Sequence, residues 1–81
     1  MSKKLELYYF AALREQTGRA EETLCEAVDT PAELYRLLEQ RYDLTLEPAS
    51  LRVAVNDRFV AMDSPLADGD RVVFIPPVAG G

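Results

Sequence analysis

The chain has 81 residues, of which 48% are hydrophobic and 28% charged, a composition that predicts one globular domain and excludes a disordered chain or a repeat array. Its net charge of −5 disfavours binding to nucleic acid, and no apolar run approaches the roughly 18 residues of a membrane span. Because the chain has no histidine and a single cysteine, histidine-based catalytic triads and the usual zinc sites are excluded, and no metal site is expected.

The first third of the chain predicts two strands with a short helix between them. Residues Lys3 to Phe10 alternate between apolar and polar side chains, which is the period of a half-buried strand. Residues 11–16 are good helix formers, and Gly18 supplies a left-handed stop. A weaker alternation over Glu22 to Val28 predicts a second strand.

The clearest local signal is the start of a longer helix at Thr30-Pro31-Ala32-Glu33. An N-cap hydroxyl, a proline at the first helical position and a glutamate three residues after the cap form a capping box. Apolar side chains then recur at helical spacing, which predicts a helix that ends near residue 42 and faces a core on one side. These side chains are Leu34, Leu37, Leu38 and Tyr42.

Three further strands are expected in the second half of the chain. Residues 51–55 and 58–60 flank the turn dipeptide Asn56-Asp57, and residues 71–75 carry apolar side chains on both faces, as central strands do. The helix has one apolar stripe and therefore needs one sheet face to cover. The element order thus predicts an α+β fold in which a mixed sheet wraps around one main helix, the β-grasp or ubiquitin-like arrangement.

Six residues follow the last predicted strand, Pro76-Pro77-Val78-Ala79-Gly80-Gly81. The two prolines favour an extended conformation, and the last three residues leave the tip almost without side chains. We therefore divide the chain into a β-grasp domain over residues 1–75 and an extended tail over residues 76–81. A frayed terminus is the alternative, although two terminal glycines arise by chance in only about 0.5% of chains.

Three segments of the chain resemble the small subunits of molybdopterin synthase, a family of ubiquitin-like sulfur carriers. They are residues 10–15, residues 63–70 and residues 73–81, and the last is the most specific because a Pro-Pro step precedes Gly-Gly. The resemblance spans essentially the whole chain. It implies that an activating enzyme akin to ubiquitin E1 uses ATP to adenylate the Gly81 carboxylate, and that a sulfurtransferase, as sulfur donor, converts the adenylate into a thiocarboxylate.

The resemblance also implies a partner that performs the remaining chemistry. The large synthase subunit would receive the threaded tail residues Pro76, Pro77, Val78, Ala79 and Gly80. The thiocarboxylate sulfur would then attack the pterin precursor to form the dithiolene of molybdopterin, in molybdenum cofactor synthesis. A heterotetramer of two small and two large subunits is implied. By itself the chain would be no enzyme and would hold no permanent cofactor.

Four residues are candidates for the partner interface. If the main helix covers Leu5, Leu7 and Phe74, then Phe10, Phe59 and Ile75 line the opposite sheet face as an apolar patch. These positions match the partner-facing patch of the family, and Arg14 is added by family position only. Ordinary edge packing is the alternative for the three apolar residues.

Cys25 is expected to be a packed core thiol rather than a reactive one, because the chain has no histidine and no basic residue lies near Cys25 in the sequence to activate it. A single cysteine forms no internal disulfide, which favours a cytoplasmic protein.

Three other functions stay open from the sequence. The chain could carry sulfur for thiamin synthesis or tRNA thiolation, could modify proteins through an isopeptide at Gly81, or could be a passive β-grasp interaction module. Deletion of Gly81 separates the last of these from the others.

Overall fold

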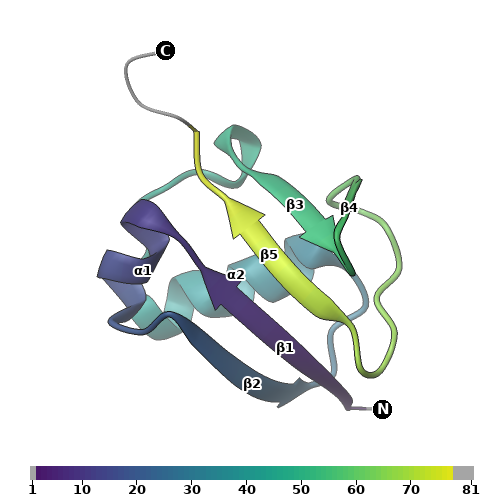
Figure 1. Ribbon diagram of the computed structural model, residues 1–81. Coiled ribbons are helices and arrows are strands. Elements are labelled where there is room, and N and C mark those ends of the chain that lie inside the picture. The colour runs from purple at the N-terminus through teal and green to yellow at the C-terminus, as the bar shows by residue number, and fades with distance from the viewer. Residues whose placement is uncertain (1, 78–81) are drawn as a thin grey trace.

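The computed structural model describes residues 2–77, and the predictions for Val78, Ala79, Gly80 and Gly81 lie outside the described residues (Figure 1). One sheet has the strand order β2-β1-β5-β3-β4. Strands β1 and β5 run parallel, and the other neighbours are antiparallel. The elements are β1 (Lys3–Tyr9), α1 (Ala11–Thr17), β2 (Glu21–Glu26), α2 (Pro31–Tyr42), the 3-10 turn η1 (Pro48–Ser50), β3 (Arg52–Val55), β4 (Arg58–Val60) and β5 (Arg71–Ile75). The predicted α+β, β-grasp fold is therefore confirmed.

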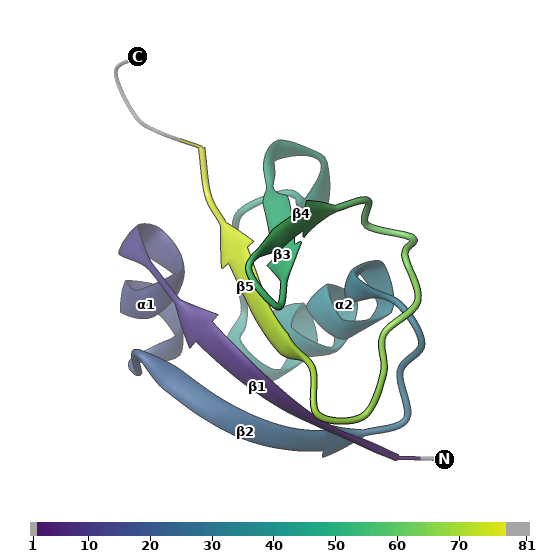
Figure 2. The same cartoon turned by 45° about the vertical axis from the view of Figure 1, so that its right-hand side comes forward.

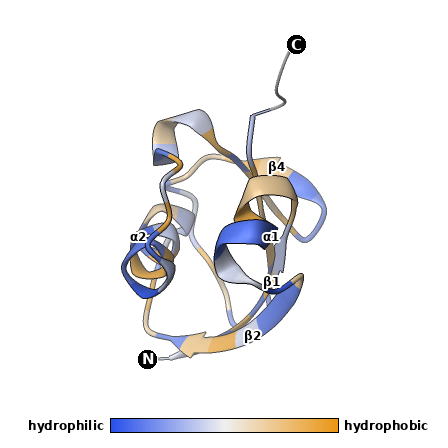
Figure 3. Ribbon diagram, turned by 90° about the vertical axis from the view of Figure 1, so that its left-hand side faces the viewer, coloured by the Kyte–Doolittle hydropathy of each residue, from blue (hydrophilic) through white to orange (hydrophobic). Residues whose placement is uncertain are grey.

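Helix α2 forms a second layer on one face of the sheet (Figures 1 and 3). The rings of Tyr35 on α2 and Phe74 on β5 lie 5.1 Å apart between their centroids. Each such apolar side chain stabilises the fold by roughly 1.5–3 kcal/mol when it is fully buried. The strand side chains buried on this face are Leu5, Leu7, Tyr9, Leu24, Val53, Val72 and Phe74.

The start of α2 differs from the predicted capping box in one contact. The Thr30 hydroxyl accepts a hydrogen bond from the Glu33 amide at 3.2 Å, as expected of an N-cap. The Glu33 carboxylate, however, accepts from the amide of Asp29 at 2.8 Å, which is one residue before the cap. The helix stripe also differs, because Tyr35 is fully buried whereas Leu37 is only partly buried.

The second strand begins and ends earlier than the sequence pattern predicted, at Glu21–Glu26 rather than at residues 22–28. Its register places Leu24 opposite Leu5 on the face that α2 covers. Cys25 therefore points to the other face at the sheet edge and is exposed. The prediction of a packed core thiol is wrong. The alternation of the strand was predicted correctly, but α2 covers the face that carries Leu24, and Cys25 lies on the opposite face.

The turn between β3 and β4 was predicted from its chemistry. Asn56 and Asp57 have φ values of 52° and 71°, and positive φ at both positions is what a two-residue type I′ hairpin loop requires. The Asn56 side chain also accepts from the Arg71 amide at 3.0 Å and donates to Asp70 at 2.9 Å. These bonds fix the start of β5 against the hairpin.

Candidate functional site

No helix among residues 2–77 covers the second face of the sheet, which is the face toward the viewer in Figure 1. Strand pairing sets Tyr8, Val73, Ala54 and Phe59 in one row across β1, β5, β3 and β4. Phe59 is 68% exposed, a large value for an aromatic side chain. Phe10 and Ile75 lie two positions further along the chain than Tyr8 and Val73, and we call the row together with these two residues the outer sheet face.

An apolar groove lies where the chain leaves β5. Because β1 and β5 are parallel and adjacent, the end of β5 emerges beside the turn from β1 into α1 (Figure 2). Phe10 occupies that turn and is 54% exposed. The groove, which we call the tail-root groove, is lined by Phe10, Ala11, Ala12, Leu46, Ile75, Pro76 and Pro77.

The predicted interface residues fall into two places. Phe10 and Ile75 line the tail-root groove together with Pro76 and Pro77. Phe59 lies at the β4 end of the row and lines a separate depression between β3 and β4. The structure therefore divides the predicted apolar patch into two zones, and the interface assignment stays a prediction.

Arg14 is exposed on α1 and lines a shallow depression together with Gly18 and Arg19. In the part of the chain that the structure describes, Arg14 forms no ion pair, whereas Arg19 pairs with Glu22. The guanidinium of Arg14 is thus available to a partner, close to the first turn of α1. Its interface role stays a prediction.

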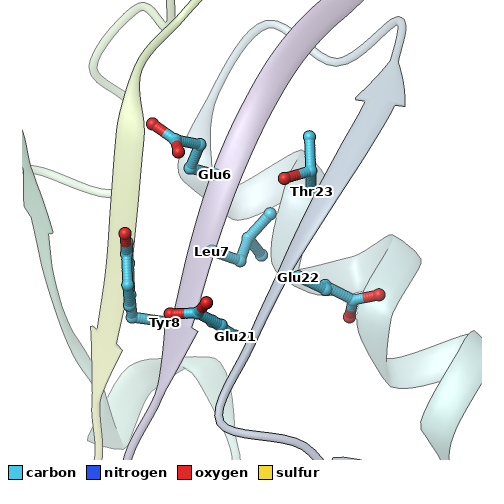
Figure 4. Close-up of a pocket in the computed structure, with 6 residues that line it drawn as sticks. All are labelled: Glu6, Leu7, Tyr8, Glu21, Glu22 and Thr23. Atoms are coloured by element: carbon cyan, nitrogen blue, oxygen red, sulfur yellow. The ribbon is translucent and has the colours of Figure 1, made fainter.

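The flank of the outer sheet face over β1 and β2 is acidic. Figure 4 shows a depression lined there by Glu6, Leu7, Tyr8, Glu21, Glu22 and Thr23. Register pairs Glu21 with Tyr8 and Thr23 with Glu6, so two carboxylates lie on this side of the row. Among residues 2–77, no three His, Cys, Asp or Glu side chains form a cluster that could hold a metal ion. The Glu6 and Glu21 carboxylates give this flank a negative charge.

The buried tyrosines supply no proton-transfer group at neutral pH. Burial, and then a hydrogen bond to Glu22, raises the pKa of Tyr9 well above its ordinary value. Burial also raises the pKa of Tyr35 to about 12, with a further contribution from the charge of Glu39. Both hydroxyls stay protonated and serve as donors, to Glu22 and to the Leu46 carbonyl.

Leu46 is a groove residue that the sequence analysis missed. It lies in the connection between α2 and η1. Leucine alternates with polar residues over positions 43–47, and this alternation is the signal that could have drawn attention to Leu46. No helix in the described part of the chain has the length and apolarity to cross a membrane.

Comparison with known proteins gives one consistent result. The model of the ThiS family matches residues 7–81. The molybdopterin synthase sulfur carrier subunit of Escherichia coli (strain K12) is 39% identical over 80 residues, which cover 95% of this chain and 99% of the relative. Proteins of the same name from Haemophilus influenzae and Mycobacterium tuberculosis are 34% and 35% identical over similar lengths.

Solved structures with the same fold include the HVO 2177 protein of Haloferax volcanii. It superposes with a TM-score of 0.81 at 33% identity and covers 99% of this chain and 88% of its own. A complex of subunits 1 and 2 of the molybdopterin-converting factor of Helicobacter pylori contains a chain with a TM-score of 0.63 and 26% identity, over 96% of this chain and 99% of that one.

Proposed function

Because the chain belongs to the ThiS family, we propose that it is the sulfur carrier subunit of a molybdopterin synthase. The observation that carries this proposal is the near-full-length similarity, at 34–39% identity, to three proteins of that name. The fold agrees with it, because a β-grasp body presents β5 at its centre and releases the following residues at one end of the sheet.

The proposed chemistry takes place at Gly81. Its carboxylate attacks the α-phosphorus of ATP on an E1-like enzyme, which releases pyrophosphate and leaves an acyl-adenylate. A sulfur donor then displaces AMP, so that the carbonyl carbon exchanges an oxygen for sulfur and becomes a thiocarboxylate. AMP stays attached to Gly81 only until the sulfur donor displaces it, so the thiocarboxylated chain carries no nucleotide. In this sense it is the sulfur-donating part of a sulfurtransferase complex.

The large synthase subunit is the proposed acceptor. Pro76 to Gly80 would lie in its active-site channel, while the outer sheet face and Arg14 contact its surface. The thiocarboxylate sulfur would attack the pterin precursor there, and hydrolysis would return the Gly81 carboxylate. Two such transfers complete the dithiolene, in an assembly of two small and two large subunits.

Intact-mass measurement tests the proposal. The chain is incubated with ATP, the E1-like enzyme and a sulfur donor, with a variant that lacks Gly81 as the matched control. We expect a mass gain equal to the exchange of one oxygen for sulfur, mapped to Gly81 and absent from the control. An unchanged mass, with the enzyme active on another carrier, would refute the proposal and leave a passive interaction module.

The acceptor decides between sulfur pathways. A thiocarboxylated chain that delivers sulfur to the pterin precursor through the large subunit supports the molybdopterin role. Delivery to thiamin synthesis or tRNA thiolation instead would assign the chain to those pathways. Covalent adducts with lysine side chains of other proteins would assign it to protein modification.

A further inference from the structure

We propose that Leu46 completes the tail-root groove as a docking point for an apolar side chain of the large synthase subunit. The proposal rests on the proposed function and names a contact within it. Leu46 comes from the connection between α2 and η1, whereas the other lining residues come from the β1–α1 turn and the end of β5. The groove therefore exists only because three separate segments meet beside the tail.

Three hydrogen bonds hold this connection in place. The Gln16 side chain on α1 donates to the Thr45 hydroxyl at 2.8 Å and accepts from the Thr45 amide at 3.0 Å. The buried Tyr35 hydroxyl on α2 donates to the Leu46 carbonyl at 2.8 Å. Residues 45 and 46 are thus tied to both helices. A wall fixed in this way loses little conformational entropy when a partner binds.

The groove is apolar throughout its lining. Leu46 and Ile75 are half-buried, so part of each side chain packs inward and part faces the groove. Ala11 has a φ of 50°, a left-handed conformation that is costly for alanine. Backbone strain of this kind concentrates at functional sites. A charged partner group would lose its hydration here without gaining a hydrogen bond, so an aliphatic or aromatic side chain is the fitting occupant.

The position of the groove selects the large subunit as the source of that side chain. Ile75, Pro76 and Pro77 form the stem of the tail, so a protein that takes the tail into its active site must cover them. The groove also continues the outer sheet face, because Phe10 and Ile75 belong to both. A similar chain occurs in the Helicobacter pylori complex of subunits 1 and 2 of the molybdopterin-converting factor, so a two-subunit assembly is known for a chain of this fold.

Two leucine truncations on the same connection test the proposal. Leu44 is half-buried against the core, as Leu46 is, but it does not line the groove. Calorimetric titration of the large subunit should show a Kd about tenfold higher for Leu46→Ala and a change of less than twofold for Leu44→Ala. Thermal melting by circular dichroism checks that both variants are folded. Ala12→Leu, which fills the groove from α1, should weaken binding without touching the connection.

The possible outcomes distinguish a failure of the Leu46 docking proposal from a failure of the proposed sulfur-carrier function. Equal affinity of the wild type, Leu46→Ala and Ala12→Leu for the large subunit would overturn it. A loss confined to the E1-like enzyme, or to self-association in sedimentation, would assign the groove to that occupant and overturn it as well. If the wild type binds no large subunit, the proposed function fails with it. The thiocarboxylate mass on Gly81 shows independently whether the chain carries sulfur.

Discussion

Tyr9 and Tyr42 donate their hydroxyl hydrogens to one carboxylate, that of Glu22. Tyr9 ends β1 and Tyr42 ends α2, and their rings meet edge to face with centroids 6.4 Å apart. The Glu22 side chain is only 8% exposed and also lies 3.3 Å from the Arg19 guanidinium. Three donors from three segments thus satisfy a nearly buried charge. They fix the end of β1 immediately before Phe10.

Replacement of Glu22 by glutamine should destabilise the fold. The amide keeps the size of the side chain but offers one acceptor oxygen to two buried hydroxyls, and it loses the charge that strengthens each bond. We expect urea denaturation to show a loss of about 2 kcal/mol in the free energy of unfolding. Glu26→Gln is the matched control on the same strand. Its more exposed pair with Arg41 should cost less than about 1 kcal/mol, and equal losses would contradict the network.

Stability should fall at alkaline pH. Burial raises the pKa of Tyr35 to about 12 and that of Tyr9 further, whereas an unfolded tyrosine titrates near pH 10. Above pH 10 the unfolded chain therefore loses protons that the native chain keeps, so the stabilisation present below pH 10 is lost as the pH rises through the folded-state pKa.

Urea midpoints measured between pH 8 and pH 11 test this prediction. Each of the two tyrosines contributes at most about 1.4 kcal/mol per pH unit, so a loss of about 2 kcal/mol is expected between pH 10 and pH 11. In the Tyr35→Phe variant the free energy of unfolding should fall less steeply with pH above pH 10. This variant should also be less stable at neutral pH, because it lacks the hydrogen bond to the Leu46 carbonyl. A flat profile up to pH 11 would refute the assignment.

The N-cap of α2 gives a prediction of a different kind. Thr30→Ala removes the hydroxyl that accepts from the Glu33 amide, and such a loss costs about 1 kcal/mol of unfolding free energy. Thr23→Ala on the exposed face of β2 makes the same chemical change away from any helix end, and it should cost a few tenths of that. If the two substitutions lowered the free energy of unfolding equally, the N-cap hydrogen bond would make no specific contribution to stability.

Much of the fold was predictable because it depends on local chemistry. The alternation in β1, the cap of α2 and the Asn56-Asp57 turn each follow from neighbouring residues, and all three are confirmed. The Glu33 bond to Asp29, one residue before the predicted position, shows the limit of even this local pattern.

Features that depend on distant pairing were less predictable. The bounds of β2 follow from its pairing with β1, and the exposure of Cys25 follows from which face of β2 is covered by α2; the weak alternation showed neither. The tail-root groove depends on three segments that meet in space, so the alternation over residues 43–47 could not show that Leu46 lines it. Phe10 and Ile75 were identified from resemblance and face alternation together. The division of the chain at residue 75 and the tail assignments stay predictions.

A charge at Phe10 should prevent docking without unfolding the chain. Phe10 is half-exposed, so glutamate there remains hydrated in the free protein but would be desolvated in the groove. We expect Phe10→Glu to raise the Kd for the large subunit at least a hundredfold in calorimetric titration. Arg36→Glu places the same residue on the exposed side of α2, away from the outer sheet face, and should leave the Kd within about twofold. An unchanged Kd for Phe10→Glu would refute the assignment of Phe10 to the partner interface.

The separation of Phe59 from Phe10 predicts independent contributions to binding. Phe59 lies on the edge strand β4 and is 68% exposed, whereas Phe10 lines the groove at the tail root. Central, enclosed anchors carry more binding energy than rim contacts, so Phe10→Ala should raise the Kd more than tenfold and Phe59→Ala about threefold. Because the two side chains line different depressions, the double variant should show the product of the two factors. A double variant no weaker than Phe10→Ala alone would mean that both residues belong to one cooperative patch. The predicted single interface would then be correct, and the division into two zones would be wrong.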